Sequence, residues 1–172
     1  MVYHSKSLKD TQKFAALLAK ALRPIRQDFD GEPFGGESLR TVEPLSRTAH
    51  GRQALVIALK GNLGSGKTTF TQGFLRGLGV KKKITSPTFV IFKRYELIVN
   101  RYKFVYHIDC YRIKKSQELL ILGIKEIFDN PKNIVLIEWP EKIKNILPKE
   151  RFNLRFEYGK KENERSIMMS DY

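Results

Sequence analysis

The residues best suited to chemistry in this sequence form one glycine-rich stretch. Residues 61–68 have the sequence GNLGSGKT and match the pattern G-x-x-x-x-G-K-[ST] in full. Glycines at these positions let the backbone turn tightly and point its N–H groups at phosphate oxygens. Lys67 supplies an ammonium for the β- and γ-phosphates, and Thr68 supplies a hydroxyl ligand for Mg²⁺. The pattern predicts a site for a nucleoside triphosphate.

A site of this kind also needs a carboxylate that holds Mg²⁺ or orders its water molecules. Two candidates follow short apolar runs: Asp109 comes after FVYHI, and Glu138 comes after IVLI. Ligands of open α/β sheets collect at the carboxyl ends of the strands, so we expect both side chains to converge on the phosphates. Each could instead be a capping or surface carboxylate, but the phosphate-binding pattern favours the functional interpretation.

Other side chains near these positions have more than one interpretation. The segment 85–88, TSPT, carries hydroxyls that could order a phosphate-sensing switch or form an ordinary turn before a strand. Trp139, the only tryptophan, is either core or a cover over the site. His107 is expected to pack or to form a hydrogen bond rather than to act in catalysis. No cationic helix end is evident beside Cys110, so it is not expected to be reactive.

Short strands and helices must position these residues. Apolar runs and one alternating pattern predict strands at residues 54–59, 88–95, 103–108, 134–137 and 152–158, with a further candidate at 166–169. Apolar residues at helical spacing predict helices at 7–22 and 67–78, and two short pieces within 117–128 that separate at Gly123. The alternation predicts an α/β class: a three-layer P-loop NTPase fold whose central sheet is mostly parallel, with antiparallel strands towards the C-terminus.

Residues 23–53 differ from the rest of the chain, because prolines and glycines are scattered through them without periodicity. Loops of this length are uncommon in compact domains unless they are functional or disordered. We therefore predict a mobile insertion in a single domain that covers residues 1–172.

Composition sets broader limits. The chain has 172 residues and a formal net charge of +14, which fits a polyanionic partner such as RNA or a generally basic proteome. The single cysteine excludes an intrachain disulfide and favours a cytoplasmic location. No run of about 18 apolar residues exists, so we expect no association with a membrane.

Five motifs, in their order along the chain, resemble the TsaE (YjeE) family of small bacterial P-loop ATPases. They are GNLGSGKTTF, SPTF, YHIDCYR, ELLILGIKEIF and VLIEWPEKI. The resemblance implies an ATPase with ATP and Mg²⁺ that supports threonylcarbamoyl transfer to adenosine 37 of tRNA, in the modification called t6A. It also implies TsaD and TsaB as partner proteins, and contact with tRNA only through that complex. We expect the chain to be a monomer on its own.

The resemblance implies roles for particular residues. Those expected around the nucleotide are Gly64, Ser65, Gly66, Lys67, Thr68, Thr69 and Trp139. Those expected to hold Mg²⁺ are Thr68 and Glu138, and those expected to act in catalysis are Lys67, Asp109 and Glu138. Those expected to form a switch-like segment are Ser86, Pro87 and Thr88. The insertion is longer than the family's usual connection.

Two other functions stay open at this point. A small-molecule kinase with the same loop would carry an arginine-bearing lid, but the arginine-rich segment 23–53 lies upstream of the loop, an unusual place for one. A basic tRNA-binding module without hydrolysis would explain the charge of +14, although no aromatic-rich RNA motif supports it.

Overall fold

The computed structural model describes residues 1–22, 52–87, 90–97 and 102–171. In these residues a seven-stranded sheet has the order β1-β7-β6-β2-β5-β4-β3. The strands are β1 (Val2–Ser5), β2 (Leu55–Gly61), β3 (Phe92–Glu96), β4 (Phe104–Asp109), β5 (Asn133–Glu138), β6 (Phe152–Tyr158) and β7 (Arg165–Asp171). The helices are α1 (Leu8–Lys20), α4 (Lys67–Gly77), α5 (Gln117–Ile121), α6 (Ile124–Phe128) and the short 3₁₀ helix η2 (Pro140–Ile143).

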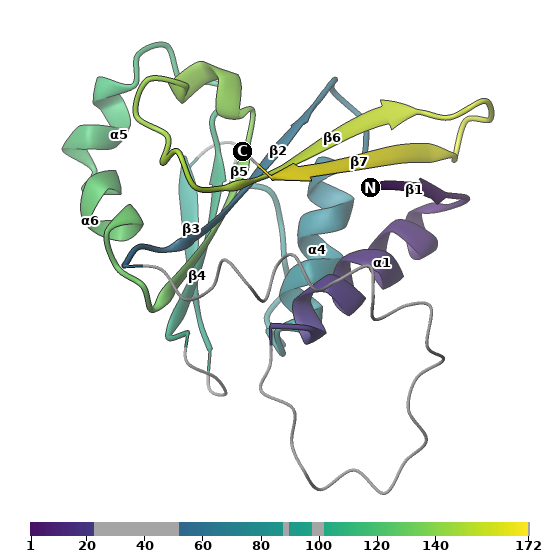
Figure 1. Ribbon diagram of the computed structural model, residues 1–172, viewed down its shortest axis with the longest axis horizontal. Coiled ribbons are helices and arrows are strands. Elements are labelled where there is room, and N and C mark those ends of the chain that lie inside the picture. Colours follow the sequence, from purple (N-terminus) through teal and green to yellow (C-terminus); the bar gives the residue numbers. More distant parts are fainter. Residues whose placement is uncertain (23–51, 88–89, 98–101, 172) are drawn as a thin grey trace, which may run out of the picture.

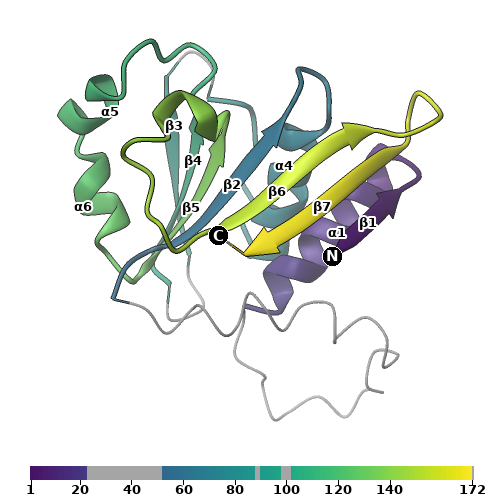
Figure 2. The same cartoon turned by 45° about the horizontal axis from the view of Figure 1, so that its top comes forward.

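The sheet is the middle of three layers. Helices α1 and α4 lie side by side against one face, while α5 and α6 cover the other (Figure 1). The turned view in Figure 2 shows the same separation. The α/β class predicted from the alternation of strand and helix is therefore confirmed.

The centre of the sheet is parallel, as predicted. Strand β2 pairs in parallel with β5 and β6, and β5 pairs in parallel with β4. Strand β7 is antiparallel to β6, which agrees with the prediction for the C-terminal part. Two antiparallel edges were not predicted: β1 pairs with β7, and β3 pairs with β4. The connection from Glu96 to Phe104 is too short for the crossover that a parallel pair needs.

The predicted strand at 88–95 was wrong at its start. Strand β3 begins at Phe92, and Ile91 before it has a φ of 64° that breaks an extended run. Residues 88 and 89 lie outside the described part of the chain. The predicted insertion, 23–53, also lies outside it except for Arg52 and Gln53.

Strand β2 is buried on both faces, which explains its continuous apolar run. Side chains alternate across a strand, so Leu55, Ile57 and Leu59 enter the core under α1 and α4. Val56 points the other way, into the core under α5 and α6. The strand that leads into the phosphate-binding pattern is thus packed against an apolar core on each face of the sheet.

Helix α1 begins where the sequence indicated. The side chain of Ser7 accepts a hydrogen bond from the backbone N–H of Asp10, so Ser7 caps the helix. Gly123 separates α5 from α6, also as predicted. In the described part of the chain, no helix combines the length and the apolar character needed to cross a membrane.

Candidate nucleotide-binding site

The glycine-rich stretch forms the loop between β2 and α4. Gly66 has a φ of 101°, which favours glycine, and it immediately precedes the first residue of α4. The amino end of α4 faces a cavity of about 310 Å³, which is within the usual size range of ligand sites. The lining residues are Leu63, Gly64, Gly66, Lys67, Thr68, Thr69, Ser86, Asp109, Tyr111, Glu138 and Trp139.

The sequence-predicted residues largely meet at this cavity. Of the set expected around the nucleotide, only Ser65 does not line it; its side chain is buried within the same loop. Thr88, the last residue of the expected switch-like segment, lies outside the described residues. Ser86 is in place beside the cavity.

The two candidate carboxylates end neighbouring strands. Asp109 and Glu138 are the last residues of β4 and β5 and are paired in register. Both side chains are buried, with 6% and 3% of their surface exposed. The parallel pairing therefore brings together two acids that are far apart in the sequence, at the carboxyl edge where α/β sheets bind ligands.

Thr68 and Glu138 form the contact expected of a magnesium site. The hydroxyl oxygen Oγ1 of Thr68 lies 3.1 Å from Oε1 and 3.0 Å from Oε2 of Glu138. Hydroxyl and carboxylate oxygens are ligands that Mg²⁺ prefers, and Mg²⁺ commonly takes its other ligands from water and phosphate. No group of three or more His, Cys, Asp or Glu side chains that could hold a metal ion occurs in the described residues.

Asp109 has different partners. One of its oxygens, Oδ2, accepts a hydrogen bond of 2.9 Å from the Ser86 hydroxyl. The other, Oδ1, accepts one of 3.0 Å from the backbone N–H of Tyr111. The acid at the end of β4 thus holds part of the segment 85–87 against the site.

Lys67 is held by its own loop. Its Nζ donates hydrogen bonds to the carbonyl oxygens of Gly61 at 2.7 Å and Asn62 at 2.8 Å. Burial lowers the pKa of the Lys67 amine, while the negative charges of nearby carboxylates, Glu138 foremost, oppose the shift.

Trp139 covers this ammonium. The Lys67 Nζ lies 4.1 Å from the centroid of the indole ring, a cation–π contact. The backbone of Trp139 has φ 60° and ψ 51°, a conformation that bulky residues rarely adopt and that costs free energy. The ring packs on the core at one side and lines the cavity at the other.

Sequence reasoning missed two residues that contact the loop. The Tyr158 hydroxyl donates a hydrogen bond to the carbonyl oxygen of Leu63. Arg165 donates one of 3.1 Å, from Nη2, to the carbonyl oxygen of Gly64. Both residues lie where β6 turns into β7, and only the pairing of β6 with β2 brings this turn to the loop. Local patterns carried no signal for such a contact.

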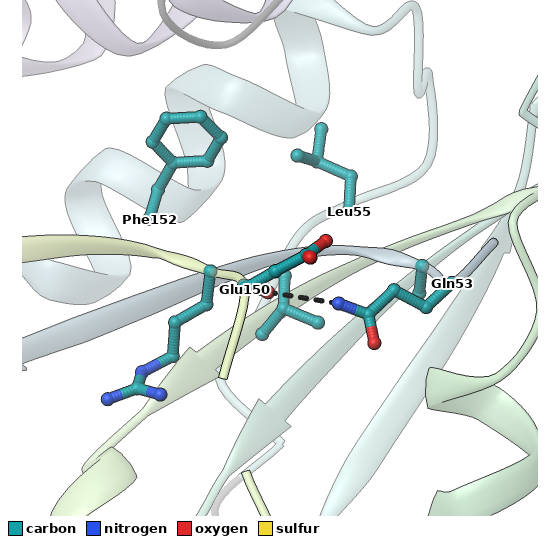
Figure 3. A pocket seen from close by; sticks show the side chains of 7 residues that line it. Gln53, Leu55, Glu150 and Phe152 are labelled. Carbon is teal, nitrogen blue, oxygen red and sulfur yellow. Dashed lines mark hydrogen bonds between the residues drawn. The ribbon is translucent and has the colours of Figure 1, made fainter. Parts of the chain in front are cut away.

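A second cavity lies at the opposite, amino ends of the parallel strands. Figure 3 shows it between the start of β2 and the start of β6, where the Gln53 side-chain amide donates a hydrogen bond of 3.4 Å to the carbonyl oxygen of Glu150. Its volume of about 10 Å³ admits about one water molecule. It offers no room for a nucleotide.

A parallel strand that runs into a glycine-rich loop and a helix, with buried acids at the ends of neighbouring strands, defines a P-loop nucleotide-binding protein. The family model described as "Threonylcarbamoyl adenosine biosynthesis protein TsaE" matches residues 5–167. The chain belongs to this family, as its motifs indicated, and the family takes part in t6A biosynthesis in tRNA.

Similar proteins agree with this assignment. The chain is 38% identical to the TsaE protein of Haemophilus influenzae over 109 residues, which cover 63% of the chain and 66% of that protein. It is 42% identical to the TsaE protein of Bacillus subtilis over 99 residues, which cover 58% and 59%. The chain thus spans less than two thirds of the length of both relatives. The crystal structure of YdiB from Bacillus subtilis superimposes with a TM-score of 0.66 at 26% identity, covering 99% of this chain and 84% of that one.

Proposed function

We propose that this chain is a Mg²⁺-dependent ATPase that supports threonylcarbamoyl transfer to adenosine 37 of tRNA. One observation carries the proposal: the Thr68 hydroxyl, which ends the phosphate-binding pattern, lies within 3.1 Å of both oxygens of the buried Glu138. This pair would hold Mg²⁺ at the amino end of α4, beside the phosphates of ATP. Family membership supplies the tRNA-modification context.

Hydrolysis of ATP demands positioning and charge stabilisation rather than covalent chemistry from the protein. The backbone N–H groups of the loop and the amino end of α4 receive the phosphates. The Lys67 ammonium exchanges the carbonyl oxygens of Gly61 and Asn62 for phosphate oxygens. Asp109 orients the attacking water, and Thr68 and Glu138 would hold a Mg²⁺ that supplies charge neutralisation.

The resemblance to the family implies partner proteins. We propose that the chain works with TsaB and TsaD, that TsaD performs the transfer, and that tRNA is reached through this assembly. We propose that the protein acts in the cytoplasm, because its single cysteine, Cys110, is a buried free thiol, which suits a reducing compartment.

The test measures ATP hydrolysis by the purified chain mixed with purified TsaB, TsaD and Mg²⁺. Removing one group that stabilises developing charge typically costs about 10²-fold or more in rate. We expect losses of that size in Lys67→Ala and Glu138→Gln. The matched control is Glu126→Gln, which changes an exposed acid on α6 and should leave the rate unchanged. Full activity in either site variant, with its fold intact, would refute the proposal.

A further inference from the structure

The proposed magnesium ligand Glu138 has a second buried partner. His107 and Asp109 alternate along β4 with Val105, which lies in the core under α1 and α4, so both side chains point to that face. On β5, the residue paired with His107 is Leu136. The imidazole of His107 extends past Leu136 towards Glu138, two residues further along β5. The distance from His107 Nε2 to Glu138 Oε1 is 2.8 Å, and none of the His107 surface is exposed.

The hydrogen-bond network assigns the proton on this imidazole. A carboxylate only accepts hydrogen bonds, so Nε2 carries the proton and donates it to Glu138. The other ring nitrogen, Nδ1, is buried without a partner among the described residues. The contact with Glu138 needs a proton on Nε2 and places no demand on Nδ1.

We propose that His107 is a positioning residue for the magnesium site. Its N–H engages Oε1 of Glu138 and holds the carboxylate in the plane where Oε2 lies 3.0 Å from the Thr68 hydroxyl. Partners of metal-binding carboxylates act in this way, and their removal typically costs about 10–100-fold in metal affinity. The inference rests on the proposed function but adds a residue that neither the phosphate-binding pattern nor the carboxylates specify.

A merely space-filling role makes a different prediction. Packing alone would require only the shape of the imidazole, whereas positioning requires an N–H at the place of Nε2. Glutamine puts an amide N–H near that place, while asparagine is shorter and puts it near Nδ1. The pair His107→Gln and His107→Asn therefore separates the two roles, with His107→Leu as the variant that has no donor.

The experiment measures Mn²⁺ binding to the ADP complex by electron paramagnetic resonance, and ADP binding in EDTA by calorimetry. We expect Mn²⁺ affinity to fall by about tenfold or more in His107→Asn and His107→Leu, and to stay within about threefold of wild type in His107→Gln. ADP affinity in EDTA should change by less than about twofold in all three. Wild-type Mn²⁺ affinity in His107→Asn and His107→Leu would overturn the inference.

Two further readouts keep the outcomes distinct. If wild-type protein binds ADP with no dependence on Mg²⁺ or Mn²⁺, the proposed function itself fails and the positioning role fails with it. If the variants do not fold, the imidazole of the wild-type protein is measured by long-range ¹H–¹⁵N NMR. A proton on Nε2 of His107 supports the inference, and an Nε2 without a proton overturns it.

Discussion

Lys67 shows at the residue scale how the loop is prepared for an anionic ligand. In the described structure its ammonium is satisfied by two carbonyl oxygens and the face of Trp139. On the proposed function, phosphate oxygens compete with these contacts, so the affinity for nucleotide measures a difference between two sets of interactions. The same burial that keeps the amine in place also disfavours its charge.

This burial predicts a pH dependence of nucleotide binding. Phosphate favours the protonated form of the Lys67 amine. At a pH where the amine of the free protein begins to deprotonate, the complex with ADP therefore keeps more protons bound than the free protein does. The affinity for ADP should therefore fall as pH rises through the lowered pKa of Lys67, starting below its ordinary value of 10.5. Calorimetric titrations from about pH 7 to about pH 10 measure the fall.

The matched control is Lys67→Arg, because a guanidinium keeps its proton throughout this range. Its ADP affinity, even if weaker, should stay level with pH in the interval where the wild type declines. Parallel declines in both proteins would show that another group is responsible.

At the element scale, two contacts set the geometry of the loop and of α4. The turn between β6 and β7 binds the loop from outside through Tyr158 and Arg165. On the other side, α1 packs closely on α4, and Gly73 leaves room for the α1 backbone at Gln12. The loop therefore depends on elements at both ends of the described chain.

Tyr158→Phe removes only the hydroxyl that binds the Leu63 carbonyl. A neutral hydrogen bond contributes about 0.5–1.5 kcal/mol, so we expect ADP affinity to fall by about two- to tenfold. The control is Lys160→Met, an exposed change in the turn between β6 and β7. Equal ADP affinity in the wild type and Tyr158→Phe would show that the contact does not hold the loop in its binding form.

Gly73→Ala tests the packing of α1 on α4. A β-carbon at Gly73 would lie 2.6 Å from the Cα of Gln12, which is closer than real contacts. Alanine is the better helix former by about 1 kcal/mol, yet we expect a net loss of about 1–3 kcal/mol in the free energy of unfolding. Urea denaturation measures it, and Arg76→Ala at an exposed position of α4 should change it by less than about 0.5 kcal/mol. A stabilised Gly73→Ala protein would contradict the close packing.

At the scale of the whole molecule, one sheet separates two apolar cores while the chain carries a net charge of +14. The two cores pack against the two faces of the sheet. The excess of basic residues acts against compactness, because like charges repel one another across the folded surface. Salt screens this repulsion.

We therefore expect the melting temperature to rise when NaCl is raised from about 20 mM to about 200 mM. Relief of about 1 kcal/mol would raise it by about 2–4 °C for a chain of this size. Differential scanning calorimetry measures the shift, and KCl at the same ionic strength should reproduce it. A fall in melting temperature would mean that attractive ion pairs outweigh the repulsion.

The sequence determined the local parts of this protein. The glycine-rich pattern, the apolar runs of β2 and β5 and the helical spacing in α4 each depend on residues close together in the chain. The class of fold and the family followed from their order, and both are confirmed. The start of β3 was misjudged and β1 was missed, because a short edge strand has little pattern of its own.

Only the tertiary structure decided how distant side chains meet. The sequence named Asp109 and Glu138 separately, but the pairing of β4 with β5 sets them side by side. The same register brings His107 to Glu138, and the pairing of β6 with β2 brings the turn at Tyr158 to the loop. Local patterns show which face of an element is buried. Which element lies beside it is decided by packing and hydrogen bonding between segments far apart in the chain.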